Sequence, residues 1–142
     1  MRVSDRQGGF TLTEVVTVIA ILGMLAAFAL PRFAALQVEA RSAATEALQS
    51  RVRSGAALAH ARWLEEDRPA FVKVDGMTIG MVNGYPSRTS IDDTLSDFVG
   101  FRYSPRSGVF ANTGASATCS VTYTEAASES LAPTISIDTS GC

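Results

Sequence analysis

The feature that most constrains this chain is an almost uncharged run from Phe10 to Leu30, FTLTEVVTVIAILGMLAAFAL. Glu14 is the only ionisable side chain in the run, which also lacks Pro, Asn and Gln. As a helix the run would measure about 30 Å, close to the thickness of the hydrocarbon core of a bilayer. A buried core helix is the alternative, but a chain of 142 residues is one domain of ordinary size and too small to cover a helix that is apolar on all sides. The run therefore predicts that residues 10–31 enter a membrane.

The flanks of the run argue against an ordinary secretory signal. Such a signal has an apolar stretch of roughly 7–15 residues that ends in a small-x-small cleavage site. Here the small residues, Gly8 and Gly9, precede the run, and a helical pattern continues beyond Pro31. A cut after Gly9 would remove the charged leader, residues 1–9, and keep the apolar helix as the new N-terminus.

The segment RQGGFTLTEVVTVIAILGMLAAFALPRF resembles the leader and N-terminal helix of a type IV prepilin. Gly9, Phe10, Glu14 and Pro31 each lie at the spacing typical of that family. The resemblance implies that prepilin peptidase cuts between Gly9 and Phe10 and methylates the new amine of Phe10. A weaker similarity in PRFAALQVEARSAATEAL and in the later NGYP points to pilins of the mannose-sensitive haemagglutinin type.

Glu14 is the unusual residue of the apolar run. A charged side chain near the centre of a membrane helix costs about 2.5–3.5 kcal/mol on insertion scales, although a place near the helix start lowers this cost. Cleavage would add a positive amine at Phe10, and two charges in an apolar bundle are tolerable if they pair. The pair could form within one chain, or Glu14 could remain a lone interfacial carboxylate. The family resemblance implies instead that the amine of an incoming subunit meets Glu14 of a neighbour, which makes both residues, with Pro31, candidates for assembly.

The remainder of the chain predicts an α+β fold. Residues 32–64 continue the helix as an amphipathic one, because apolar or small side chains recur close to a 3.6-residue period. Pro31 is expected to kink this helix without ending it. The resemblance implies the type IV pilin fold, in which the hydrophobic first half of the helix protrudes and the second half packs on a small antiparallel sheet. Residues 65–142 would supply that sheet, with strands expected at 71–74, 77–79, 100–103, 118–123 and 134–138, a turn at 83–86 and a short helix at 90–98 opened by a capping box between Ser90 and Asp93.

Cys119 and Cys142 are the only cysteines of the chain. A bridge between them would stabilise the fold by about 3–3.5 kcal/mol in the chain-entropy model and would hold the C-terminus. It would also place residues 32–142 in an oxidising compartment outside the cytoplasm. Type IV pilins often carry a disulfide-bounded C-terminal loop, so the resemblance agrees with the bridge. The alternative is two unrelated free thiols.

The sequence offers little for catalysis or for ligand chemistry. His60 is the only histidine, and no nucleophile signature accompanies it. The acidic residues match no calcium-loop spacing, and one His with two Cys is too few for a zinc site. A net charge of −2 gives no electrostatic reason for a nucleic-acid partner. We therefore expect no enzyme, no cofactor, no metal and no specific nucleic acid.

Sequence and resemblance together predict a structural subunit of a type IV pilus, inserted in the inner membrane of a bacterium as a precursor and then polymerised into an extracellular fimbrium with adhesion or motility roles. The implied partners are further copies of the chain, prepilin peptidase, a cytoplasmic assembly ATPase and platform proteins. A pseudopilin of a type II secretion system or a minor pilin remains an alternative, because these proteins share the N-terminal motif. A signal-anchored periplasmic domain that does not polymerise is an alternative from a different class.

Overall fold

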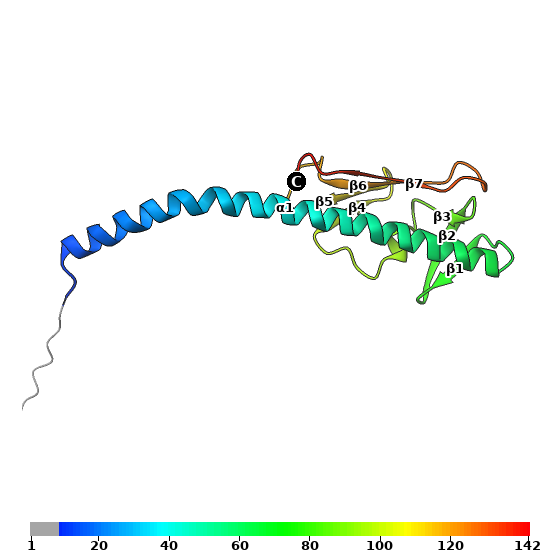
Figure 1. Ribbon diagram of the computed structural model, residues 1–142. Coiled ribbons are helices and arrows are strands. Elements are labelled where there is room, and N and C mark those ends of the chain that lie inside the picture. The colour runs from blue at the N-terminus through cyan, green and yellow to red at the C-terminus, as the bar shows by residue number, and fades with distance from the viewer. Residues whose placement is uncertain (1–8) are drawn as a thin grey trace, which may run out of the picture. The chain divides into compact units, whose positions relative to one another are not determined.

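The structure is a computed structural model that describes residues 9–142, so residues 1–8 of the predicted leader lie outside the described residues. The chain divides into two units, Met1–Gln37 and Val38–Cys142. One α-helix, α1 (Leu12–Glu65), contributes to both units and continues through Pro31 (Figure 1). The expectation that Pro31 does not end the helix is confirmed. The predicted boundary between a membrane segment that ends at residue 31 and an outer domain that begins at residue 32 stays a prediction.

In the unit Val38–Cys142, the strands after α1 form two antiparallel sheets. The first sheet has the order β1-β2-β3 and the second β4-β5-β6-β7, so neighbours in each sheet are also consecutive in the chain. This meander topology needs no crossover, because each strand pairs with the next one along the chain. Figure 1 shows both sheets beside the later part of α1. The strands are β1 (Phe71–Val74), β2 (Met77–Val82), β3 (Tyr85–Pro86), β4 (Phe101–Ser104), β5 (Val109–Asn112), β6 (Ser120–Thr124) and β7 (Thr134–Asp138).

Two hairpins of the first sheet turn on residue pairs that accept a positive φ. Asp75 and Gly76 have φ of 48° and 86°, and Asn83 and Gly84 have φ of 53° and 82°. Two consecutive positive φ angles define a type I′ turn, for which Asp-Gly and Asn-Gly are the preferred pairs. The turn predicted at 83–86 is confirmed at Asn83 and Gly84, whereas Tyr85 and Pro86 form the short strand β3.

The second half of α1 packs on both sheets with successive turns of one face. Leu48, Val52 and Ala56 join the core of the four-stranded sheet, in which Phe110, Val121 and Tyr123 are also fully buried. Ala59 and Trp63, one and two turns further on, join a second core built on the three-stranded sheet, with the following members of that sheet: Val72, Val74 and Ile79. The fold is therefore α+β, with one helix facing antiparallel sheets, as the sequence predicts.

Three details differ from the sequence prediction. The chain forms two sheets where one was expected. Strand β5 was not predicted, because its sequence VFAN does not alternate between apolar and polar residues. The helix predicted at 90–98 is wrong, since only a short 3₁₀ turn, η1 (Asp92–Thr94), forms there. The Ser90 hydroxyl donates to the carbonyl of Gly80 at 2.9 Å. It therefore ties two segments together and does not cap a helix.

Candidate functional site

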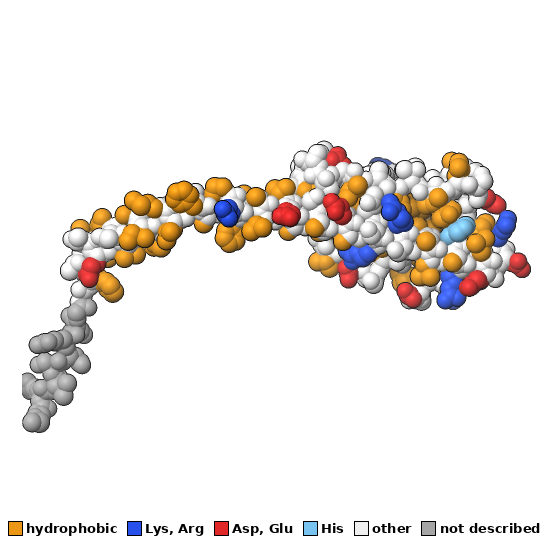
Figure 2. Space-filling model, viewed as in Figure 1, with side chains coloured by type: hydrophobic (Ala, Val, Ile, Leu, Met, Phe, Trp, Pro, Cys, Tyr) orange, Lys and Arg blue, Asp and Glu red, His pale blue; other side chains and the backbone are white. Residues whose placement is uncertain are grey.

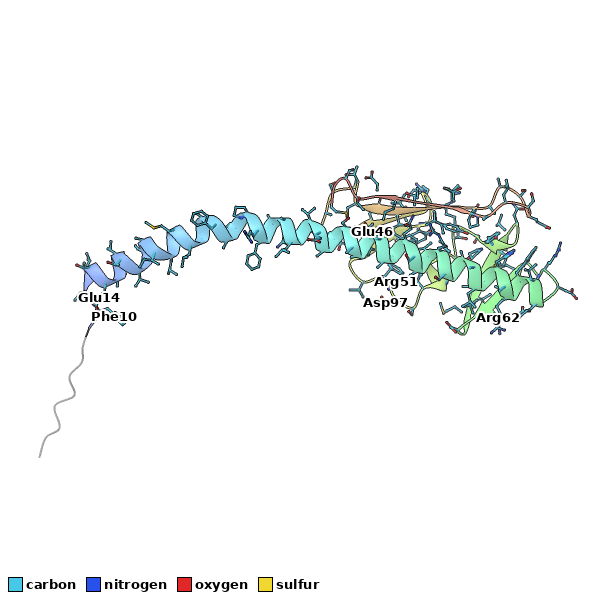
Figure 3. All side chains as sticks on the ribbon, in the orientation of Figure 1. Phe10, Glu14, Glu46, Arg51, Arg62 and Asp97 are labelled. Carbon is cyan, nitrogen blue, oxygen red and sulfur yellow. A yellow bond between two sulfur atoms is a disulfide. The ribbon has the colours of Figure 1, made fainter. Side chains whose placement is uncertain are left out.

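The N-terminus of α1 is closed by a reciprocal cap between Thr11 and Glu14. The backbone N–H and the hydroxyl of Thr11 both donate to Oε2 of Glu14, at 2.8 and 2.7 Å. The backbone N–H of Glu14 donates back to the Thr11 hydroxyl oxygen at 3.3 Å. This is a capping box, in which residue N3 and the N-cap satisfy each other's free N–H groups. Figure 3 shows Glu14 at the first turn of the helix, next to Phe10.

The capping box gives Glu14 a structural role that the sequence analysis did not assign. Its signal, a Thr followed three residues later by a Glu directly before an apolar run, was present in the sequence. We applied that signature to Ser90 and Asp93, where it fails, and missed it at Thr11 and Glu14. Because Oε2 takes both bonds from Thr11, Oε1 of Glu14 has no hydrogen-bond partner within residues 9–142. One carboxylate oxygen therefore remains available to a group from outside the chain.

The predicted cleavage site, the bond between Gly9 and Phe10, is exposed among the described residues. Phe10 is 88% exposed. A Cβ added at Gly9 would meet no atom within 4 Å among the described residues. The Gly9–Phe10 bond lies before the first helical residue, Leu12, so it is not part of the helix. An enzyme could reach this bond without unfolding any described element.

The first half of α1 exposes a long apolar surface. No residue from 9 to 40 is buried, and this stretch is long and apolar enough to cross a membrane. Figure 2 shows apolar side chains along the whole visible face of the stretch. Consecutive helical positions point 100° apart, so a nearly continuous apolar run covers every side of the helix. Its large exposed side chains are Leu12, Val15, Val16, Val18, Ile19, Ile21, Leu22, Met24, Leu25, Phe28, Leu30, Phe33 and Leu36.

Pro31 lies inside this apolar stretch of α1. Proline has no N–H, so the carbonyl of Ala27 lacks its usual helical donor. Such a missing bond is tolerated in membrane helices when neighbours or local adjustments satisfy the carbonyl. Pro31 therefore marks a locally weakened point between the apolar stretch and the amphipathic stretch.

The predicted disulfide is confirmed, with Cys119 and Cys142 bonded and their Cα atoms 4.8 Å apart. It packs against α1, because the fully buried Thr45 hydroxyl lies 3.4 Å from Sγ of Cys119 and 3.8 Å from Sγ of Cys142. Thr45 donates its proton to the carbonyl of Arg41 at 2.7 Å, so its approaches to sulfur are packing contacts. The Arg41 guanidinium in turn donates to the carbonyl of Cys142 at 3.2 Å. The last residue of the chain is thus held on the helix from two sides, a role for Arg41 and Thr45 that the sequence did not indicate.

The turn before Cys142 is organised by Asp138. The backbone N–H and the hydroxyl of Ser140 donate to its Oδ1, at 2.9 and 2.6 Å. These two bonds favour the ionised carboxylate and lower the pKa of Asp138. The charged form of Asp138 thus holds the turn that presents Cys142 to its partner.

His60 is held in place as a packing residue. Its Nδ1 lies 2.6 Å from the carbonyl of Gly84, so this nitrogen carries the proton and donates it. The imidazole stacks on Tyr85 with ring centroids 4.2 Å apart. Gly84 combines a positive φ with a close approach to Trp63, where an added Cβ would lie 2.8 Å from the indole. Within residues 9–142 no group of three or more Asp, Glu, His or Cys could hold a metal ion.

Comparison with known proteins identifies the family of this N-terminal segment. Residues 4–30 match the family described as the prokaryotic N-terminal methylation motif. A stretch of 54 residues is 46% identical to the type IV narrow pilus major component PilA5 of Thermus thermophilus. The N-terminal segment of the chain is therefore similar to that of type IV pilins. The matched stretch covers 38% of this chain and 47% of that relative, so it spans about half of the relative's length.

No solved structure matches this chain. The motif at residues 4–30 includes Gly9, Phe10 and Glu14, whereas Pro31 lies directly after it. The predicted resemblance to type IV pilins is therefore confirmed by the motif and by the similar relative. The finer similarity to pilins of the haemagglutinin type stays a prediction.

Proposed function

We propose that this chain is a filament-forming pilin that is cleaved after Gly9, N-methylated at Phe10 and polymerised through its apolar helix. The observation that supports the proposal most strongly is the apolar surface of residues 12–36, which is exposed among the described residues 9–142. Single apolar side chains on a protein surface are ordinary, but a continuous apolar surface of this length marks contact with lipid or protein. A precursor would bury it in the inner membrane, and a polymer would bury it among copies of the same helix.

The capping box supports a specific order of events at Glu14. In the precursor, Thr11 satisfies one carboxylate oxygen and so lowers the cost of placing a charge near an apolar environment. Cleavage creates a positive amine at Phe10, which methylation leaves charged. The free oxygen Oε1 of Glu14 would accept that amine from an incoming subunit. A pair between the amine of one copy and Glu14 of another needs correctly placed copies, so it favours extraction from the membrane in register.

The outer part of the chain, residues 32–142, would lie outside the cytoplasm. Its disulfide is stable in an oxidising compartment, which agrees with a periplasmic precursor and an extracellular fimbrium. Prepilin peptidase, an assembly ATPase and platform proteins would act on this subunit. Adhesion or motility would then be a property of the assembled filament. Among the described residues there is no metal cluster, and His60 has a packing role.

An intact mass of protein from sheared, pelleted cell-surface material tests processing and export together. The expected mass equals residues 10–142 plus one methyl group and minus the two hydrogens lost in the disulfide. A full-length mass found only in the membrane fraction would contradict the proposal and favour an anchored domain that does not polymerise.

Two substitutions separate the charge of Glu14 from its capping role. Glu14→Gln keeps an oxygen acceptor for Thr11 but removes the charge, so we expect normal cleavage and at least a tenfold loss of filament. Thr11→Val removes the cap and keeps the charge, so a smaller loss is expected. Glu39→Gln, at an exposed position of α1, is the matched control and should leave filament yield unchanged. Equal yields from Glu14→Gln and Glu39→Gln would refute the pairing of Glu14 with Phe10.

A further inference from the structure

A cavity of about 300 Å³ lies between the second half of α1, β3 and the segment that leads into β7. Its lining is mainly apolar, with Ala56 and Ala57 on the helix and Pro133 on the opposite wall. The stacked rings of His60 and Tyr85 form its end. Such a volume is at the lower end of the range for ligand cavities and can admit the tip of a loop.

The cavity carries one uncompensated positive charge. Arg53 belongs to its lining and has no ion-pair partner within residues 9–142. Other arginines of this helix stretch have partners, since Arg51 pairs with Asp97 at 3.1 Å and Arg62 pairs with Glu65 at 3.2 Å. No acidic residue lines the cavity. The surface thus fits an apolar group with a carboxylate beside it.

The chain presents such a group in the loop between η1 and β4. Val99 is 87% exposed, the highest fraction among the large apolar side chains of the unit Val38–Cys142. Asp97, two residues earlier, is also exposed, and its one ion-pair partner within residues 9–142 is Arg51 at 3.1 Å. An exposed aliphatic side chain at a loop tip with a neighbouring carboxylate complements the cavity in both shape and charge.

The loop and the cavity lie on opposite flanks of α1. Val52 is fully buried and marks the direction of the core. Arg51 and Arg53 lie one residue before and after it, so their side chains point about 100° to either side. Arg51 holds the loop through Asp97, and Arg53 lines the cavity. Figure 3 shows Arg51 and Asp97 on the same side of the helix.

We propose that Val99 of one copy inserts into this cavity of the next copy, with Asp97 facing Arg53 across the contact. This inference rests on the proposed polymerisation and names the surfaces that join the outer domains. Two different surfaces meet, so the contact is heterologous and generates an open helical array instead of a closed dimer. Along the axis of α1, the loop lies beside Arg51 and the cavity lies beside residues 53–60. Parallel copies would therefore be displaced along the helix by about one to two turns.

Cysteine cross-linking in assembled filaments tests the contact directly. The full-length double variant Val99→Cys with Ala132→Cys, produced in cells with a pilus assembly machinery, should give a covalent ladder after mild oxidation and non-reducing electrophoresis. Each single variant should run as a monomer, because each places only one new thiol at the contact. The native disulfide between Cys119 and Cys142 is present in all samples, so the single variants control for background thiol–disulfide exchange.

Three outcomes of this experiment overturn the contact. The subunits of double-variant filaments could run as monomers on the gel. Val99→Cys alone could form dimers. Val99→Cys alone could also cross-link to a protein of different mass. Absence of filaments from the unmodified chain would instead contradict the proposed function itself. The two failures are therefore distinguishable.

A charge reversal keeps the test decisive if the double variant does not assemble. Arg53→Asp places a carboxylate opposite Asp97 and should lower filament yield about tenfold. Arg106→Asp changes an exposed arginine in the turn between β4 and β5, away from the cavity, and should leave the yield unchanged. Equal yields from Arg53→Asp and Arg106→Asp would overturn the proposal.

Discussion

The two stretches of α1 share one helical geometry but differ in what surrounds them. From 9 to 40 no residue is buried, whereas the stretch from 45 to 63 buries one face completely. The first stretch is rich in large apolar side chains, and the second alternates small apolar residues with charges. The helical conformation alone therefore does not determine what a helix segment packs against. The second stretch finds its partner within the chain, whereas the first exposes a continuous apolar surface of the kind that marks contact with lipid or protein.

The size of the exposed surface shows why the first stretch cannot remain in water. Leaving a large aliphatic or aromatic side chain exposed forfeits about 1.5–3 kcal/mol relative to burying it. A few such residues equal the whole stability of a typical domain, about 5–15 kcal/mol. The following predictions test whether the two stretches differ in this way.

Removing residues 1–33 should have the largest effect. The remaining fragment keeps the buried face of α1 and both sheets, so we expect a soluble monomer with one disulfide. The full-length chain should require detergent or membranes. Sedimentation of both proteins and an intact mass of the fragment check this. A fragment that aggregates, or a full-length chain that stays soluble without detergent, would break the comparison.

A matched pair of leucines compares the stretches within that fragment. Leu48 is fully buried and Leu36 is 60% exposed. Leu48→Ala should lower the free energy of unfolding by about 2–5 kcal/mol, because it removes contacts and leaves a cavity. Leu36→Ala should change it by less than about 0.5 kcal/mol. Urea unfolding measures both values, and similar losses would show that residue 36 also has a partner within the chain.

Removing the disulfide tests how the second stretch holds the C-terminus. Replacing Cys119 and Cys142 together by alanine should lower the free energy of unfolding by about 3 kcal/mol, since the unfolded chain gains the freedom of the opened loop. Thr45→Val, which keeps the bond but removes the hydroxyl packed against it, should cost less. Hydrogen exchange of β7 should accelerate in the alanine variant. Unchanged exchange there would indicate that Arg41 and Thr45 hold the terminus without the bond.

The smallest predicted effect concerns Asp92, whose Oδ1 is buried without a hydrogen-bond partner among the described residues. Burial raises the pKa of Asp92. Its folded-state pKa lies above the unfolded value, so stability falls as the pH rises between the two, and the penalty is fully present above the folded pKa. Asp92→Asn should therefore raise the midpoint of urea unfolding of the fragment slightly at pH 7 but not at pH 3. An equal gain at both pH values would assign the effect to packing.

Patterns that are local in the chain could be predicted from the amino-acid order alone. The apolar run up to Leu30, the continuation of the helix through Pro31 and the turns at Asp75-Gly76 and Asn83-Gly84 each depend on a few neighbouring residues. The prepilin motif is local in the same sense, and residues 4–30 match it. The capping box of Thr11 and Glu14 is local in the same sense, because its signature spans four consecutive residues.

Contacts between distant segments depended on packing and could not be predicted in this way. Strand β5 has only four residues, and its place in the sheet follows from burying Phe110 between α1 and its neighbouring strands. The Ser90 hydroxyl bonds to Gly80 because the fold brings the two together, which removes it from the helix cap that its spacing suggested. Arg51 and Arg53 look alike in the sequence, yet Arg51 has an acidic partner and Arg53 has none within residues 9–142. Local order specifies backbone conformation, whereas the partner of a side chain depends on which segments the core brings within reach.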